Sequence, residues 1–262
     1  MTDALYPFLT GDPIADTTGD PDLLADLRQS AAGKASEVIE LRRRVVGRDA
    51  TRIEACAADL AAAFAAGARL LAFGNGGSST DALDLASLFL SAGNGSAGSD
   101  TAGSDTAGNG GTGSGGAGDG TGNGGSGRAL PAFALAGDVA LVTALSNDVG
   151  FDAVFARQIA ALGRRGDIAV GLSTSGNSPN LLNAFDEAHA RGLLTVGIAG
   201  GDGGRMAGLS TIDHLFVVAS PSVHRIQEAQ TTIYHVLWEL TLAALAAGNG
   251  VRATTGIGGA LR

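Results

Sequence analysis

Two turns rich in glycine and hydroxyl side chains are the strongest candidates for chemistry in this 262-residue sequence. Residues 74–79 follow a short apolar run and precede a segment whose apolar residues recur at three and four positions, and residues 173–178 repeat this arrangement. Glycine lets backbone N–H groups approach a ligand closely, and the positive end of a helix favours an anion. The pattern indicates one phosphate-bearing ligand held between the two turns.

The same residues also suit a simpler interpretation, in which the turns only begin two well-capped helices. Serine at positions 78, 79 and 178 is a good helix N-cap residue. Neither turn is a known nucleotide-binding motif. No Lys-Ser or Lys-Thr pair follows the first turn, and its glycines lack the spacing of a dinucleotide-binding fold.

Short apolar runs alternate with helical patterns along most of the chain. The predicted strands lie at residues 70–74, 131–136, 168–172, 194–198 and 212–217, and the predicted helices at 80–90, 139–145, 151–162, 179–191 and 226–247. This alternation predicts an α/β fold: a doubly wound, mostly parallel five-stranded sheet flanked by helices. Its ligands belong at the carboxyl ends of the strands.

Composition divides the rest of the chain. Residues 1–35 are predicted to be a mobile N-terminal arm, and apolar periodicity over 36–66 predicts one long helix or two consecutive helices as an N-terminal extension. Residues 92–128 consist almost entirely of small and polar residues, which predicts a disordered insertion. A single domain is therefore expected over 36–250, followed by a flexible tail at 251–262.

Charge and cysteine content narrow the class of protein. A net charge of −9 and a pI near 4.8 argue against a nucleic-acid surface, and the short basic run at 42–44 lies in a helical pattern with acidic residues. The single cysteine, Cys56, sits among alanines and predicts a buried, inert thiol. No secretory signal or membrane-spanning run is evident, so a cytoplasmic location is expected.

Five motifs occur in the order that is typical of one family. FGNGGSSTDA, ALSNDVGFDAVFARQ, GDIAVGLSTSGNS, GGDGGRMAG and HRIQEAQ resemble the motif series of sugar isomerase (SIS) domains, in the branch of the bacterial phosphoheptose isomerases. The resemblance covers about residues 42–248, without the insertion. It implies a sugar-phosphate substrate and a homo-oligomer, most simply a tetramer.

Carried over motif by motif, the resemblance assigns roles to particular residues. It implies substrate contacts at Asn75, Gly76, Gly77, Ser78, Asn147, Asp148, Ser173, Thr174, Ser175, Ser178 and Gln227. Gln227 and His235 match zinc ligands of the metal-dependent isomerases, and His235 also matches an acid–base group. Where those enzymes have a metal-binding His and, four residues on, a catalytic Glu, this chain has Asp84 and Leu88.

The departure at Leu88 leaves two functions open. Leucine neither accepts a proton nor binds a metal, so catalysis would rest on His235 and Asp84, and zinc binding on Asp84, Gln227 and His235. The alternative interpretation of these residues is that Asp84 is a solvent-facing acid and His235 a core histidine. The favoured hypothesis is isomerisation of sedoheptulose 7-phosphate to a heptose 7-phosphate. The alternative is a non-catalytic phosphosugar sensor, like the family's DnaA-binding initiation regulators.

Overall fold

A five-stranded sheet, parallel throughout, forms the centre of the molecule. The computed structural model describes residues 21–91 and 129–256. The strand order is β2-β1-β3-β4-β5, and every neighbouring pair is parallel. The strands are β1 (Leu70–Gly74), β2 (Ala132–Ala134), β3 (Ile168–Ser173), β4 (Leu194–Gly200) and β5 (His214–Val218). The predicted fold class is confirmed, and "mostly parallel" becomes wholly parallel for the described residues.

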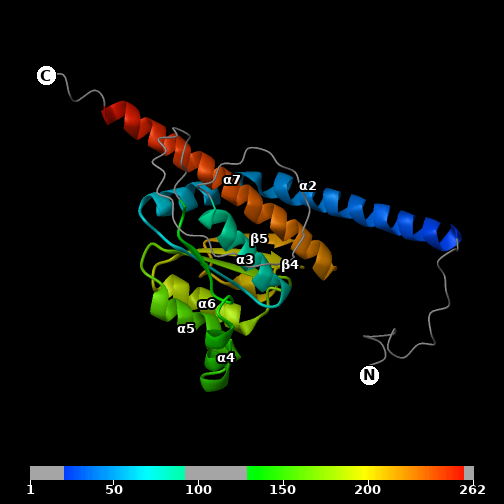
Figure 1. Cartoon of the computed structure of the whole chain (residues 1–262), viewed down its shortest axis with the longest axis horizontal. Coiled ribbons are helices and arrows are strands. Elements are labelled where there is room, and N and C mark those ends of the chain that lie inside the picture. Colours follow the sequence, from blue (N-terminus) through cyan, green and yellow to red (C-terminus); the bar gives the residue numbers. More distant parts are fainter. Residues whose placement is uncertain (1–20, 92–128, 257–262) are drawn as a thin grey trace, which may run out of the picture.

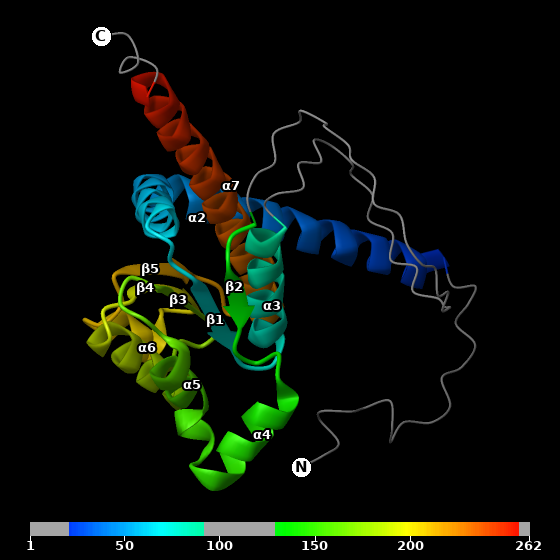
Figure 2. The same cartoon turned by 60° about the vertical axis from the view of Figure 1, so that its left-hand side comes forward.

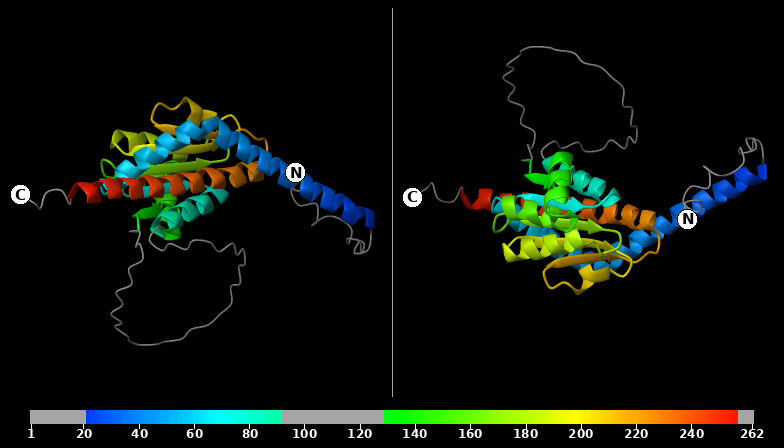
Figure 3. Two further views of the ribbon diagram at one scale, coloured as in Figure 1. Left: turned by 90° about the horizontal axis from the view of Figure 1, so that it is seen from above. Right: turned by 90° about the horizontal axis from the view of Figure 1, so that it is seen from below.

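Helices cover both faces of this sheet (Figure 1). They are α2 (Pro21–Ala65), α3 (Gly77–Leu90), α4 (Val139–Asp148), α5 (Val154–Leu162), α6 (Pro179–Ala190) and α7 (Val223–Gly256), with short 3₁₀ turns η1 (Phe151–Ala153) and η2 (Gly204–Gly208). Helices α2, α3 and α7 pack on one face, and α5 and α6 pack on the other. Figure 3 shows the long helices α2 and α7 crossing the first face.

The alternation of side chains along β1 explains why both faces need a cover. Leu70 and Ala72 join the core under α2, α3 and α7, whereas Leu71 and Phe73 join the core under α5 and α6. Successive side chains of a strand point to opposite faces, so an apolar run buried throughout requires helices on both sides. Gly171 in β3 has no space for a side chain, because the rings of Phe73 and Phe185 occupy it.

Helix α2 is one continuous helix and is longer than the sequence predicted. It begins at Pro21, so the predicted boundary of the N-terminal arm at residue 35 falls inside it. Leu24 and Leu27 are exposed there, with no repeating buried face to reveal the helix in the sequence. At the other end, α7 continues to Gly256 and includes residues assigned to the flexible tail. The insertion at 92–128 lies outside the described residues.

Arginine side chains attach α2 to the sheet and to α7. Arg48 donates to Asp49 and to the Val217 carbonyl, and Arg52 donates to the Leu215 carbonyl. Both carbonyl groups belong to β5, the edge strand of the sheet. Asp49 is 2% exposed and accepts from both guanidinium groups. Arg42 donates to the Glu228 carbonyl of α7. The basic run of the sequence is therefore partly structural, since Arg42 joins two helices.

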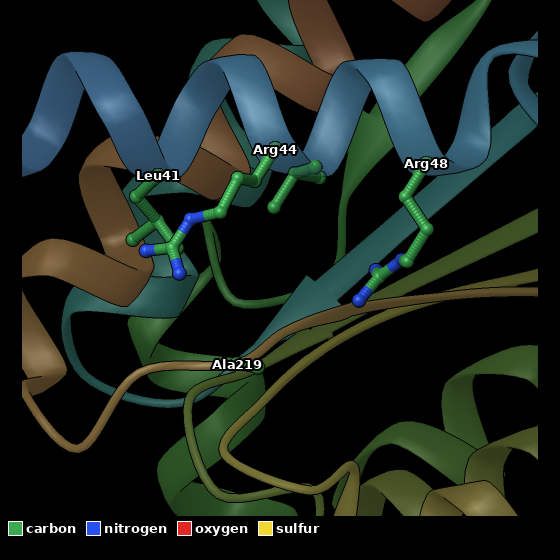
Figure 4. A pocket seen from close by; sticks show the side chains of 5 residues that line it. Leu41, Arg44, Arg48 and Ala219 are labelled. Carbon is green, nitrogen blue, oxygen red and sulfur yellow. The ribbon is translucent and has the colours of Figure 1, made fainter.

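A cavity of about 320 Å³ lies between α2 and the segment that follows β5. Leu41, Arg44 and Arg48 project toward it from one side of α2, and Ala219 faces them (Figure 4). Its lining residues include none of the predicted site residues. Within residues 21–91 and 129–256, the helices lack the combination of length and apolar character that crossing a bilayer requires.

Candidate active site

The first turn follows β1 directly and opens α3. Its backbone reverses at Gly76, which has φ 55° and serves as the N-cap of α3. No side chain caps this helix start within the described structure, and the Ser79 hydroxyl donates instead to the Gly76 carbonyl, at 2.6 Å. The Ser78 and Ser79 N–H groups donate to the backbone carbonyls of Asn75 and Gly76, at 3.0 and 2.9 Å, so backbone groups rather than a side chain satisfy this helix start.

Asn75 is held by Asn180, a residue that lies outside the motifs of the sequence. Its side-chain amide exchanges two hydrogen bonds with that of Asn180, each 2.9 Å long. Asn180 is 1% exposed and lies in the first turn of α6. The pair fixes the β1–α3 turn against the start of α6. The two predicted turns are therefore neighbours at the carboxyl edge of the sheet, as the parallel strand order requires.

The second turn connects β3 to α6. Ser173 is 5% exposed, and its hydroxyl accepts from the Gly176 N–H at 3.0 Å, which shapes the turn. The Ser175 hydroxyl accepts from the Asn177 N–H at 3.3 Å. Ser178 occupies the N-cap position of α6, but its side chain makes no capping hydrogen bond in this part of the structure.

The glycine run after β4 packs against the second turn. Gly176 has φ 65°, and a side chain there would collide with the Gly203 carbonyl. The backbone N–H of Met206 donates to the Gly176 carbonyl, and that of Arg205 donates to the Asn177 side chain, both at 2.9 Å. The GGDGGRMAG motif is therefore a support for the Ser173–Ser178 turn, and small residues are needed where the two backbones touch.

A buried glutamine of α7, Gln230, also holds the Ser173–Ser178 turn. It is fully buried on α7, and its side-chain amide donates to the carbonyls of Ser173 and Ile198, each at 3.1 Å. It thus joins the carboxyl ends of β3 and β4 to α7. Its amide oxygen is buried without a partner among the described residues. Gln230 is the last residue of the HRIQEAQ motif, but the sequence does not reveal its role, because its partners are backbone groups far away along the chain.

Gln227 lies against the start of α3. A side chain at Gly77 would collide with the Gln227 amide, so the glycine is required for this contact. Burial raises the pKa of the nearby Asp81 carboxyl, a hydrogen bond with Gln227 opposes the rise, and the charge of Asp84 adds to it. One Asp81 oxygen is buried without a hydrogen-bond partner in the described residues. The structure thus adds Asp81 to the site.

Asp84, Tyr234 and His235 form one cluster between α3 and α7. The Tyr234 hydroxyl donates to Asp84 Oδ2 at 2.7 Å, and His235 Nε2 lies 3.6 Å from the same oxygen. The Tyr234 and His235 rings stack with centroids 5.2 Å apart. Burial raises the pKa of Tyr234, as do the bond to Asp84 and its charge, so the phenol stays protonated and remains the donor. We call these residues the Tyr–Asp–His cluster.

The alternative interpretations of Asp84 and His235 are only partly right. The Asp84 side chain is 51% exposed, as expected for a surface acid, but it is engaged by two residues of α7. The His235 side chain is 41% exposed, so it is not a core histidine. Both side chains therefore face each other and remain open to solvent or to a ligand.

Asn147 and Asp148 are placed differently from the other predicted residues. They form the last turn of α4, beyond the predicted helix end at 145, and both are exposed. The Asn147 amide donates to Asp148 Oδ1 at 2.9 Å. Helix α4 has no buried residue and projects away from the sheet (Figure 2). Within the described residues, no side-chain hydrogen bond joins this pair to either turn.

The residues that the resemblance implies for zinc are a poor fit to that metal. A catalytic zinc site uses three protein ligands. The described residues contain no group of three or more His, Cys, Asp or Glu that could hold a metal ion, so Gln227 would have to be the third ligand beside Asp84 and His235. Asp84 is already bonded by Tyr234, Gln227 lies against Gly77, and Leu88 is apolar and packs against the core. We therefore derive no chemical step through a metal.

Comparison with known proteins places this site in a class. Residues 121–200 match the sequence profile of the SIS domain. The phosphoheptose isomerase of Desulfovibrio desulfuricans is 39% identical over 208 residues, which cover 79% of this chain and 83% of that protein. The phosphoheptose isomerase of Pelodictyon phaeoclathratiforme is also 39% identical, over 77% of this chain and 82% of that protein.

Two solved structures resemble this chain in fold and in sequence. Phosphoheptose isomerase GmhA from Neisseria gonorrhoeae superimposes with a TM-score of 0.64 at 30% identity, covering 82% of this chain and 99% of that one. A phosphoheptose isomerase from Francisella tularensis gives the same TM-score at 26% identity, with 81% and 96% covered. The protein is an SIS-domain protein, as its sheet and paired turns indicate. Within that class, the chain belongs to the phosphoheptose isomerase family.

Proposed function

We propose that this protein isomerises sedoheptulose 7-phosphate to a heptose 7-phosphate. The observation that carries the proposal is the pair of neighbouring turns with uncapped helix starts. Helices α3 and α6 both begin at the carboxyl edge of the sheet, and neither N-cap residue caps its helix through a side chain in the described structure. The positive ends of two neighbouring helices, together with the hydroxyl groups of the Ser173–Ser178 turn, suit a phosphate group.

The Tyr–Asp–His cluster lies at a suitable distance from that phosphate site. Asp84 is about two turns along α3 from Gly77, or roughly 10 Å along the helix axis. This span is comparable with the length of an extended seven-carbon sugar phosphate. A substrate whose phosphate occupies the turns would therefore present its other end, which carries the carbonyl carbon, to Asp84 and His235.

Aldose–ketose isomerisation needs two kinds of proton transfer. A base removes a proton from the carbon beside the carbonyl and returns it to the former carbonyl carbon, while a second group moves a proton between the two oxygens. We assign the carbon-bound proton to the Asp84 carboxylate, because Leu88 has no basic group. We assign the oxygen-bound proton to His235, whose Nε2 lies 3.6 Å from Asp84 Oδ2. Each proton returns to the substrate, so the reaction is balanced.

The surface of the single chain supports a homo-oligomer. Leu83 and Leu90 of α3 and Phe133 of β2 are 45–50% exposed, and Leu24 and Leu27 of α2 are similarly open. Another subunit would cover such side chains. We propose a tetramer in the cytoplasm, where a single buried thiol needs no disulfide partner. Light scattering at micromolar concentration tests the assembly, and a stable monomer would contradict it.

The direct test of the function is turnover of sedoheptulose 7-phosphate by purified protein, followed by separating the ketose and aldose phosphates. Asp84→Asn and His235→Ala should each reduce the rate by about a hundredfold or more. Ser173→Ala combined with Ser175→Ala should weaken binding in titration calorimetry. Glu40→Gln, an exposed change on α2, is the control and should alter neither measurement. Tight binding of the sugar phosphate with no turnover would instead favour the phosphosugar sensor.

A further inference from the structure

Tyr234 is the least expected member of the candidate site. Its ring is 2% exposed, and its hydroxyl reaches out of the core to Asp84 Oδ2. The donor lies on α7 and the acceptor on α3, so this bond joins the two helices that carry the proposed acid–base groups. A hydrogen bond to a carboxylate is about twice as strong as a neutral one. Asp84 is thus held by a rigid donor on the side that faces His235.

In a metal-dependent member of the family, a metal would hold the histidine that stands at the position of Asp84. The resemblance implies that zinc connects the helix after the first strand to the last helix. Here the chain offers Asp84 and His235 across this gap, while Leu88 supplies no ligand. Gln227 could become a third ligand only by leaving Gly77 and Asp81. The connection that zinc would make between α3 and α7 is already made by Tyr234.

We infer that this site works without a metal ion, with the Tyr234 hydroxyl holding Asp84 beside His235 in place of the metal. The inference rests on the proposed function for the identity of the substrate. Whether the site holds a metal ion does not depend on that function. Tyr234 is a positioning residue, since its hydroxyl bonds Asp84 rather than the sugar. The cluster supplies a carboxylate that is oriented before the substrate arrives, which saves the cost of ordering it during the reaction.

The first experiment compares Tyr234→Phe with a matched control. Thr241→Val removes another buried hydroxyl from the same helix, one that bonds only the Leu237 carbonyl in the described structure. We expect Tyr234→Phe to lower kcat by about tenfold with KM changed by less than about twofold, because Asp84 loses its orientation while the phosphate turns are untouched. Thr241→Val should leave both constants near the wild-type values, although both variants lose some thermal stability.

The second experiment measures metal directly. Wild-type protein should contain much less than one zinc per chain, and a chelator should leave turnover intact. Asp84→His combined with Leu88→Glu restores the implied ligands, and this variant should bind zinc about a hundredfold more tightly in equilibrium dialysis. Asp84→His alone is the fallback if the double variant does not fold.

Two results would overturn the inference. One is wild-type protein that carries about one zinc per chain and loses its turnover when a chelator removes it. The other is a Tyr234→Phe variant whose kcat matches that of Thr241→Val. Failure of the proposed function looks different, because the wild type would then turn over no sedoheptulose 7-phosphate with or without zinc. In that case zinc content and dialysis still decide whether the site is metal-free.

Discussion

Asp167 should be among the most sensitive polar positions outside the site. It lies just before β3, and its carboxylate accepts from the Arg69 guanidinium at 2.5 Å and from the backbone N–H groups of Arg69 and Arg164 at 2.9 and 3.0 Å. Its side chain is 5% exposed. It therefore joins the start of β1 to the loop before β3, the two central neighbours of the sheet.

Asp167→Asn keeps the shape but replaces an acceptor oxygen with an N–H group that faces other donors. Breaking a buried pair costs about 3–5 kcal/mol, and the partial exposure of Arg69 lowers this to roughly 2–4 kcal/mol, because water can reach the freed guanidinium. For a domain of this size, at about 2–4 °C per kcal/mol, that corresponds to a fall in Tm of about 4–16 °C. Thermal unfolding at fixed protein concentration measures it, with Glu40→Gln as an exposed ion-pair control expected within about 0.5 kcal/mol.

Lowering the pH provides a second test of the interaction between Arg69 and Asp167. Burial alone would raise the pKa of Asp167, but hydrogen bonds from Arg69 and Arg164 and the charge of Arg69 outweigh it and hold the pKa below its usual value. The stabilisation is therefore fully present above the unfolded-state pKa of about 3.9 and is lost as pH falls through the lower folded-state value. The difference in the free energy of unfolding between wild type and Asp167→Asn should persist from pH 7 to 5 and narrow below about pH 4. Equal losses in Asp167→Asn and Glu40→Gln, or a gap unchanged in acid, would refute the reasoning.

Three further predictions concern single positions. Gly77→Ala should displace the Gln227 amide and weaken sugar-phosphate binding by about tenfold in calorimetry, whereas Gly47→Ala, with open space around it on α2, should raise stability by up to about 1 kcal/mol. Burial raises the pKa of the Cys56 thiol to about 12, and a nearby acid contributes to the rise. Cys56 should therefore resist thiol reagents until the protein unfolds, and rapid labelling of the native protein would contradict this. Gln230→Leu should cost about 1–3 kcal/mol in chemical denaturation, because two buried carbonyl groups lose their donor; an unchanged midpoint would show that these bonds add nothing.

Local patterns in the sequence determined the fold and the positions of the two turns. Apolar runs that are buried on both faces, such as β1 and β3, are short and uninterrupted, and glycines end them before a helical pattern begins. That information lies within a few residues of each element, so strand and helix identity could be predicted. Element ends could not. Strand β2 spans only Ala132–Ala134, and α4 runs on to Asp148, because pairing and packing with distant segments set those limits.

The partners of each site residue were decided by the tertiary structure. The Tyr234–Asp84 bond joins positions 150 residues apart, and the Asn75–Asn180 pair joins positions 105 residues apart. No spacing in the sequence predicts either contact, since each depends on how α3 is rotated against α7 and how the two turns meet at the sheet edge. The sequence alone showed that Leu88 removes a base and a ligand. Only the packing of α3 on α7 showed that a tyrosine holds Asp84, because that depends on which faces of the two helices meet.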